Sequence, residues 1–196
     1  QVGDAREAAV AITMIVPHIA PNDSRLGQRV SLLRARLSLL QGQPATAQLW
    51  IRRAEDALQA ADEGTAQERS TLASTRREIL LVRSEIAERS RRFAEAVEHA
   101  AAASRVDTSG EPYADEDVAA AALRLGEARL AAGDANGAAS ALATAVAIYA
   151  RDHDASSPLL ARAKRAELRV AALSARQGAK PARTSAVRRD GGSHGG

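Results

Sequence analysis

The feature that most constrains the fold of this chain is a spacing that occurs four times. A turn position at residue 3, 42, 91 or 133 is followed five, nine and twelve residues later by small or apolar side chains. Offsets of five, nine and twelve lie on one face of an α-helix, whereas a strand would place its buried residues at every second position. Each segment therefore predicts a helix that begins just after a turn and buries one stripe. The stripes are Ala8, Ile12 and Ile15; Ala47, Ile51 and Ala54; Ala96, Ala100 and Ala103; and Ala138, Leu142 and Ala145.

A second pattern precedes the last three turns and predicts another helix before each of them. A large apolar residue stands ten places before the turn, a small one seven before and an apolar one five before. These residues are Leu32, Ala35 and Leu37; Leu81, Ser84 and Ile86; and Leu123, Gly126 and Ala128. Each unit is then a helical hairpin. The small residue seven before the turn and the alanine five after it are expected to touch, because a bulky side chain there would push the two antiparallel helices apart.

The composition favours the same all-α fold. About a quarter of the residues are alanine and only 2% are aromatic. Alanine is the best helix former, and sheets need the branched and aromatic residues that are scarce here. The expected helices cover residues 4–20, 24–41, 44–62, 66–90, 92–106, 115–132, 135–151 and 157–177.

The last hairpin resembles the tetratricopeptide repeat. Leu125-Gly126, Gly133, Ala138, Leu142 and Ala145 match the small-residue skeleton of that family. The resemblance covers roughly residues 3–175, and the turns are 39, 49 and 42 residues apart. This longer period resembles the extended repeats of bacterial regulators. The resemblance implies a right-handed superhelical solenoid of antiparallel hairpins over residues 1–177, with the final helix near 157–177 as a cap.

The resemblance also implies where a partner would bind. In the family, the concave groove is lined mainly by the first helix of each hairpin and holds a peptide or protein. Carried over by position, the groove candidates are Arg29, Leu32, Arg36, Glu78, Leu81, Glu85, Arg89, Leu123 and Glu127. The leucines fit a core position equally well, and an ordinary solvated face is the alternative for the charged residues.

The function implied by the resemblance is a non-catalytic protein–protein interaction module, part of a larger bacterial regulatory protein. The alternative is an intramolecular regulatory or dimerisation scaffold for an upstream kinase or transcription-activator domain, and self-association stays open. The chain starts at Gln1 without an initiator methionine. We therefore expect it to be an excised fragment.

The charge of the chain disfavours a nucleic-acid partner. The formal net charge is +3, but from Arg176 onward five basic residues face a single acidic one, so the body is close to neutral. A nucleic-acid-binding domain is expected to carry a basic face, and the few aromatic residues cannot build a stacking platform. Residues 178–196 are rich in Gly, Ser, Ala and Arg. They are expected to form a disordered basic tail.

Neither metal nor cofactor chemistry is indicated. The chain has no cysteine, and His18, His99, His153 and His194 are scattered without metal-ligand spacing. Asp152-His153-Asp154 beside Ser156 contains the residue types of a hydrolytic triad. Neighbouring residues in one loop cannot form the linear relay that a triad needs, so a capping loop is expected. The sequence therefore predicts no enzyme, no metal and no cofactor.

Three further patterns complete the expectations. Asp115, Glu116 and Asp117 should stabilise the positive end of a helix, since they lack the spacing of a calcium loop. Glu85 with Arg89, and Glu88 with Arg92, are expected as surface pairs four residues apart. The longest apolar run, residues 8–16, is far below the roughly 20 residues needed to cross a bilayer. No membrane partner is therefore expected, and a cytoplasmic location is favoured.

Overall fold

The computed structural model describes residues 24–60, 65–107 and 114–178, and within these ranges the chain is helical, without strands. The helices are α2 (Ser24–Leu40), α3 (Pro44–Gln59), α4 (Ala66–Arg89), α5 (Phe93–Ala103), α6 (Ala114–Ala131), α7 (Ala135–Asp152) and α8 (Pro158–Gly178). The expected all-α fold is confirmed. The expected helix over 4–20, the turn near residue 3 and the tail from residue 179 onward lie outside the described residues.

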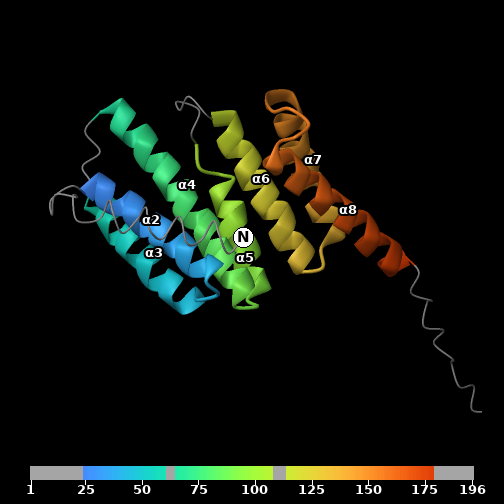
Figure 1. Ribbon diagram of the computed structural model, residues 1–196, viewed down its shortest axis with the longest axis horizontal. Helices are drawn as coiled ribbons and strands as arrows, with labels where there is room; N and C mark the ends of the chain where they lie inside the picture. Colours follow the sequence, from blue (N-terminus) through green and yellow to red (C-terminus); the bar gives the residue numbers. More distant parts are fainter. Residues whose placement is uncertain (1–23, 61–64, 108–113, 179–196) are drawn as a thin grey trace, which may run out of the picture.

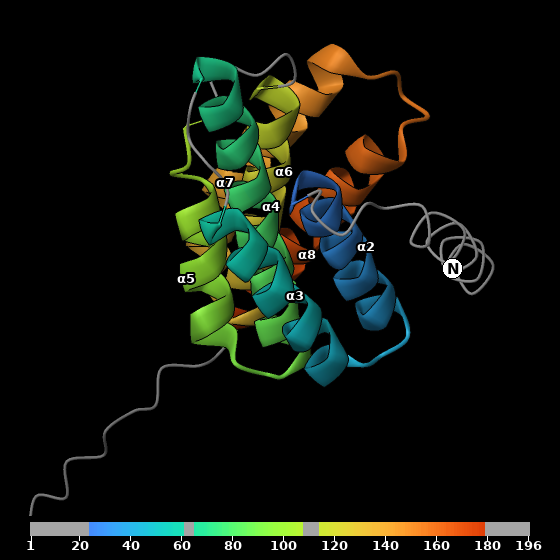
Figure 2. The same ribbon diagram turned by 90° about the vertical axis from the view of Figure 1, so that its left-hand side faces the viewer.

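The helices pack as consecutive pairs. α2 packs on α3, α4 on α5 and α6 on α7, while α8 packs on α7. Figure 1 shows them in chain order, from α2 and α3 at one end of the row to α7 and α8 at the other. The even-numbered helices also contact one another in succession, α2 with α4, α4 with α6 and α6 with α8. Viewed along the row, α2 and α8 lie toward one side and α5 toward the other (Figure 2).

The positions five, nine and twelve residues after the turns at 42, 91 and 133 form the interior. All nine of them have no exposed surface: Ala47, Ile51, Ala54, Ala96, Ala100, Ala103, Ala138, Leu142 and Ala145. The buried stripes expected from the spacing are therefore confirmed for these three segments. Small side chains occupy seven of the nine positions. Close packing of the backbones follows, because alanine leaves little between two helices except its methyl group.

The small residue seven places before each turn lies at a helix contact, as expected. A Cβ added to Gly126 would stand 2.5 Å from Leu142 Cγ, a distance that two non-bonded carbon atoms do not adopt. Ala35 is fully buried. Ser84 is also fully buried, and its hydroxyl donates a 2.8 Å hydrogen bond to the Ala96 carbonyl on α5. The polar atom of this serine is thus satisfied at a position where glycine or alanine would need no partner.

The buried side chains form three clusters with different chemistry. The cluster of α2, α3 and α4 contains Ile51, Ile79 and Ile86 among others, and the cluster of α6, α7 and α8 contains Leu142 and Tyr149. Between them, the buried members of the cluster that joins α4, α5 and α6 are all alanines: Ala87, Ala96, Ala100 and Ala128. The fully buried side chains at the centre of the row are therefore all small, with the partly buried Val97 and Leu125 packed against them.

A polar contact reinforces this alanine-rich centre. Arg77 on α4 is only 3% exposed, and its Nη1 lies 3.0 Å from Asp117 Oδ2 on α6. Arg77 Nη2 also donates a 2.6 Å hydrogen bond to the Val106 carbonyl after α5. Ser74 donates to the same Asp117 carboxylate at 3.3 Å. One buried guanidinium thus links α4 to α6 and to the segment that follows α5.

The three turns have the same backbone geometry. Gly42, Arg91 and Gly133 have φ of 72°, 59° and 84°, and among the described residues only these three have positive φ. Each ends its helix in a Schellman motif. The following residue donates to a carbonyl five positions earlier, as Gln43 does to Ser38 at 2.8 Å, Arg92 to Ala87 at 2.8 Å and Asp134 to Arg129 at 2.9 Å. The spacing of the buried residues therefore identifies all three turns, although one of them carries arginine in place of glycine.

Replacing Arg91 by glycine is therefore expected to stabilise the protein. The left-handed conformation strains any residue with a Cβ, so Arg91→Gly should raise the free energy of unfolding by about 1 kcal/mol, measured by urea denaturation. Gly133→Ala is the opposite control. A Cβ there would meet nothing within 4 Å. Gly133→Ala should lower the free energy of unfolding by about 1 kcal/mol, through backbone strain alone. If Arg91→Gly were only as stable as the parent, the left-handed conformation at residue 91 would not be a source of strain.

Candidate functional site

The candidate site is the side of the row on which the even-numbered helices meet, called the inner face below. Of the nine residues expected in the groove, five charged ones take part in contacts on this face, namely Arg36, Glu78, Glu85, Arg89 and Glu127. Arg29, Arg36 and Arg89 are exposed, and Glu78, Glu85 and Glu127 are partly buried. Leu81 is partly buried on α4, one turn from both Glu78 and Glu85.

Two of the three leucines are core residues, which corrects their expected place in the groove. Leu32 is 2% exposed and packs in the cluster of α2, α3 and α4. Leu123 is 3% exposed in the cluster of α6, α7 and α8. Both precede a turn by ten residues, and that position points toward the second helix of the hairpin. Leu81, at the same position, keeps part of its surface exposed.

Ion pairs connect α2 to α4 across the inner face. Arg36 Nη1 lies 2.8 Å from Glu78 Oε1. Arg89 donates from Nη1 to the Leu39 carbonyl at 3.1 Å and from Nη2 to Glu85 Oε1 at 3.1 Å, so the expected pair of Glu85 with Arg89 is confirmed. About half of the Arg36 and Arg89 side chains is exposed. Exposed pairs of this kind contribute at most about 1 kcal/mol each, so a partner could replace them at small cost.

α4 and α6 are joined by Arg124, which the sequence did not single out. Its Nε donates to the Ser84 hydroxyl at 2.9 Å and its Nη2 to Glu88 Oε2 at 2.5 Å. The Arg124 side chain is only 11% exposed. The sequence feature that could have indicated this contact is Ser84, because a hydroxyl group at a position expected to be buried between two helices needs polar partners.

The expected pair of Glu88 with Arg92 does not form. Glu88 forms an ion pair with Arg124 on α6, and Arg92 Nη1 lies 2.7 Å from Glu95 Oε2 on α5. The reason is the turn at Arg91, which ends α4 between the two residues. A spacing of four residues places side chains together only within one continuous helix.

α6 and α8 are joined by Glu127 and Arg162. Arg162 donates from Nε at 2.7 Å and from Nη2 at 2.6 Å to the two carboxylate oxygens of Glu127. This bidentate pair raises the pKa of the Arg162 guanidinium, which stays charged at every pH of interest. Only 14% of the Glu127 side chain is exposed. The inner face therefore carries an alternating series of guanidinium and carboxylate groups from α2 to α8.

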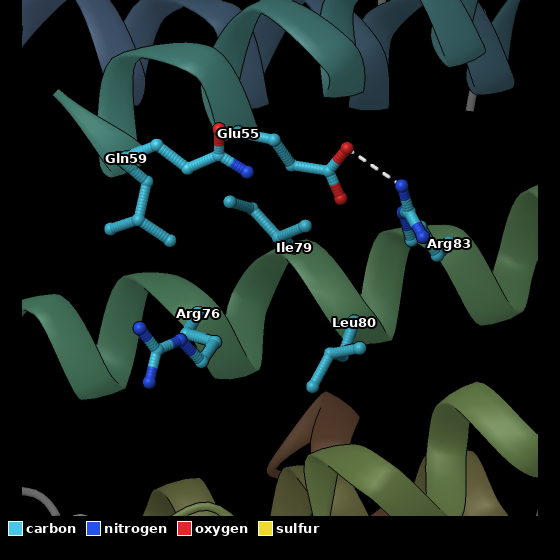
Figure 3. Close-up of a pocket in the computed structure, with 7 residues that line it drawn as sticks. Glu55, Gln59, Arg76, Ile79, Leu80 and Arg83 are labelled. Atoms are coloured by element: carbon cyan, nitrogen blue, oxygen red, sulfur yellow. Dashed lines mark hydrogen bonds and ion pairs between the residues drawn. The ribbon is translucent and has the colours of Figure 1, made fainter.

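A hollow lies elsewhere, between α3 and α4. Figure 3 shows this groove of about 370 Å³, with Glu55 on α3 pointing toward Arg83 on α4. Arg83 Nη2 lies 2.6 Å from Glu55 Oε2, while Arg76 and Leu80 point away from that pair. A second groove of about 240 Å³ lies over α6, and its lining combines alanines and Leu125 with Arg77, Arg129 and the hydroxyl-bearing Ser140 and Thr144.

The loop after α7 is an exposed loop whose side chains bond locally. Asp154 accepts hydrogen bonds from the backbone N–H and the hydroxyl of Ser156, at 2.8 and 2.6 Å, and these lower the pKa of its carboxyl. Asp152 accepts from Arg151, and the His153 ring lies 5.5 Å from the Tyr149 ring. The carboxylates and the imidazole thus have separate partners and form no relay.

The acidic cluster at the start of α6 is used in the fold. All three carboxylates lie in the first turn of the helix, where its dipole favours them. Asp115 pairs with Arg151 on α7, and Asp117 pairs with Arg77. Within residues 24–60, 65–107 and 114–178, no group of three or more metal-ligating side chains is gathered that could hold a metal ion.

No family model, no curated protein and no solved structure matches this chain. Among the helices of the described ranges, none combines the length and apolar character that crossing a membrane would require.

Proposed function

We propose that this chain is a non-catalytic protein–protein interaction module that binds a peptide or protein on its inner face. The observation that carries the proposal is the succession of contacts between α2, α4, α6 and α8, which places these four helices side by side along the row. Stacked helical hairpins produce extended surfaces of this kind and use them for binding. The shared Schellman turns and the buried small residues further support a solenoid of tetratricopeptide-like hairpins.

The charges of the inner face favour a partner that carries both signs of charge. Arg36 with Glu78, Arg89 with Glu85 and Arg162 with Glu127 alternate along the surface. A polyanion would gain from the guanidinium groups but would be repelled by the carboxylates between them. A segment of alternating acidic and basic residues could exchange partners with each pair. In our proposal, the module serves a larger regulatory protein in the cytoplasm.

Site-specific cross-linking tests this proposal, because the chain has no native cysteine. Cysteines carrying a photo-activated cross-linker are placed on the inner face, as Arg29→Cys and Glu78→Cys, in the full-length protein expressed in its own cells. Matched controls are the exposed outer positions Arg52→Cys on α3 and Ala143→Cys on α7. We expect discrete adducts with a common partner, identified by mass spectrometry, from the inner positions and not from the outer ones.

Two outcomes would contradict the proposal. Equal adducts from inner and outer positions would indicate unspecific contact. Adducts confined to other parts of the same polypeptide would favour the alternative, an intramolecular regulatory scaffold. All four substitutions are at positions that are not fully buried, so each should change the free energy of unfolding by about 0.5 kcal/mol or less.

A further inference from the structure

α8 carries a row of arginines whose charge is not compensated within the fold. Arg165, Arg169 and Arg176 follow one another at spacings of four and seven residues, so they lie along one side of the helix. They are called the basic stripe below. All three side chains are exposed. Within the part of the chain that the structure describes, none of the three guanidinium groups forms a hydrogen bond, an ion pair or a ring contact.

The basic stripe differs in this respect from the arginines that connect the even-numbered helices, each of which binds a carboxylate: Arg36, Arg89, Arg124 and Arg162. The one acidic residue of α8, Glu167, precedes Arg169 by two positions and therefore lies on the opposite side of the helix. Like charges four residues apart on a helix repel each other. The fold thus gains nothing from the charge of the basic stripe, whereas a negatively charged partner would compensate it.

A hollow of about 290 Å³ adjoins the basic stripe, between α6 and α8. Its lining consists of Leu130, Arg169, Ala172, Leu173 and Arg176. Leu130 follows Glu127 by three residues, and Glu127 binds Arg162 on α8, so the hollow lies beside the last ion pair of the inner face. Gln177 Nε2 donates to the Gly133 carbonyl at 3.0 Å, which joins the end of α8 to the turn after α6. Aliphatic walls between two unpaired guanidinium groups suit an apolar side chain that stands between carboxylates.

The distribution of charge along the chain points to the same kind of partner. Residues 158–196 contain nine basic and two acidic residues, which is a net charge of +7. Because the whole chain carries +3, residues 1–157 carry −4. An acidic segment is therefore attracted to α8 and repelled by the rest of the chain. Residues 179–196 are themselves basic, so their charge disfavours them as the occupant of the hollow.

The chemistry of α8 favours a protein over a nucleic acid or a membrane as the source of this negative charge. α8 has no aromatic side chain on which a base could stack. A helix that binds a lipid surface turns a broad apolar face toward it. The apolar residues Leu160, Ala163 and Val170 of α8 are instead buried in the protein, and only Leu168 among its large apolar side chains is mostly exposed.

We propose that the basic stripe and the adjoining hollow bind an acidic segment of the partner protein, with an aliphatic side chain in the hollow and flanking carboxylates on Arg169 and Arg176. Charge-assisted hydrogen bonds to guanidinium groups would orient the segment, and burial of the aliphatic side chain would add affinity. This inference rests on the proposed function, because the hollow lies at the end of the inner face. It also orients the partner, whose acidic end would lie at α8.

Three labelled peptides test the proposal against the full chain. Each has about eight residues, enough to extend beyond the basic stripe. The first alternates leucine with glutamate, the second has glutamine in place of glutamate, and the third has serine in place of leucine. By fluorescence anisotropy, we expect the leucine–glutamate peptide to bind at least about tenfold more tightly than either of the others, and increasing salt to weaken its binding.

A pair of charge-matched double variants locates the binding surface. Arg169→Glu with Arg176→Glu should weaken the leucine–glutamate peptide by about tenfold or more. The control is Lys164→Glu with Arg52→Glu, which changes the net charge equally at exposed positions on another side of α8 and on α3. Its affinity should stay within about twofold of the parent. Circular dichroism verifies that each variant is folded.

Four results would overturn the inference. Failure of the leucine–glutamate peptide to bind would remove the acidic segment, while the proposed function would stand if cross-links still formed on the inner face. Equal binding of all three peptides would leave the stripe and the hollow without a role. Equal loss in both double variants would indicate unspecific charge attraction. Tighter binding of a thymidine oligonucleotide or of phosphatidylserine vesicles, lost in the Arg169 and Arg176 variant, would assign the stripe to a nucleic acid or a membrane.

Discussion

Ala138→Glu is expected to unfold the C-terminal hairpin. Ala138 has no exposed surface, and its carbonyl lies 3.4 Å from where a Cβ on Gly126 would stand. A glutamate there would bury a carboxylate between α6 and α7 without a partner, at a cost of several kcal/mol. Thermal unfolding followed by circular dichroism should show loss of helicity at 25 °C or a melting temperature lowered by more than about 10 °C.

The neighbouring residue supplies the control for this substitution. Ala139 is exposed on the same helix. Ala139→Glu introduces the same side chain with almost the same helix propensity, so its melting temperature should stay close to that of the parent. If the two variants melted alike, the assignment of Ala138 to the helix contact would be wrong.

Asp117→Ala should have the second-largest effect, because it leaves the Arg77 guanidinium buried without its carboxylate. Arg77 is 3% exposed, and it would retain only the Val106 carbonyl as a partner. Removal of one member of such a pair costs about 3 kcal/mol, measurable as a shift in the urea midpoint. Asp115→Ala also removes a first-turn carboxylate that pairs with an arginine, but both of those side chains are mostly exposed. Its cost should stay below about 1 kcal/mol.

A double substitution separates buried charge from lost packing. Arg77→Met together with Asp117→Ala removes both charges and keeps most of the volume of the arginine. This variant should recover most of the stability lost in Asp117→Ala, since apolar residues often replace a buried pair without penalty. A double variant as unstable as the single one would show that the contact matters through its shape and not through its charge.

The helices and the buried stripes could be predicted from the sequence because both depend on local spacing. Ile51 and Leu142 are found buried since the turn before each fixes which face of the helix points inward. The bonds of Arg124 and Arg162 could not be predicted in this way. They join residues 35 to 40 positions apart, and which side chains meet depends on how one hairpin is rotated against the next.

The leucines show a second limit of the sequence. Leu32, Leu81 and Leu123 occupy the same position relative to their turns, but only Leu81 keeps more than a small part of its surface exposed. Helical periodicity gives the direction of a side chain around its own axis and not what covers it. The interpretation of these residues as core or groove therefore required the neighbouring helices.

The alanine cluster between α4, α5 and α6 has a mechanical consequence. Apolar contacts lose their stabilisation gradually, in proportion to the area that separates, whereas a hydrogen bond fails once its geometry changes by a fraction of an ångström. The two ends of the row bury large apolar side chains as well as alanines. Its centre is held by alanine methyl groups and the partly buried Val97 and Leu125, together with the bonds of Arg77, Ser84 and Arg124. Under tension along the row, the helices at the two ends should therefore separate gradually, whereas the helices at the centre should separate abruptly once these hydrogen bonds break.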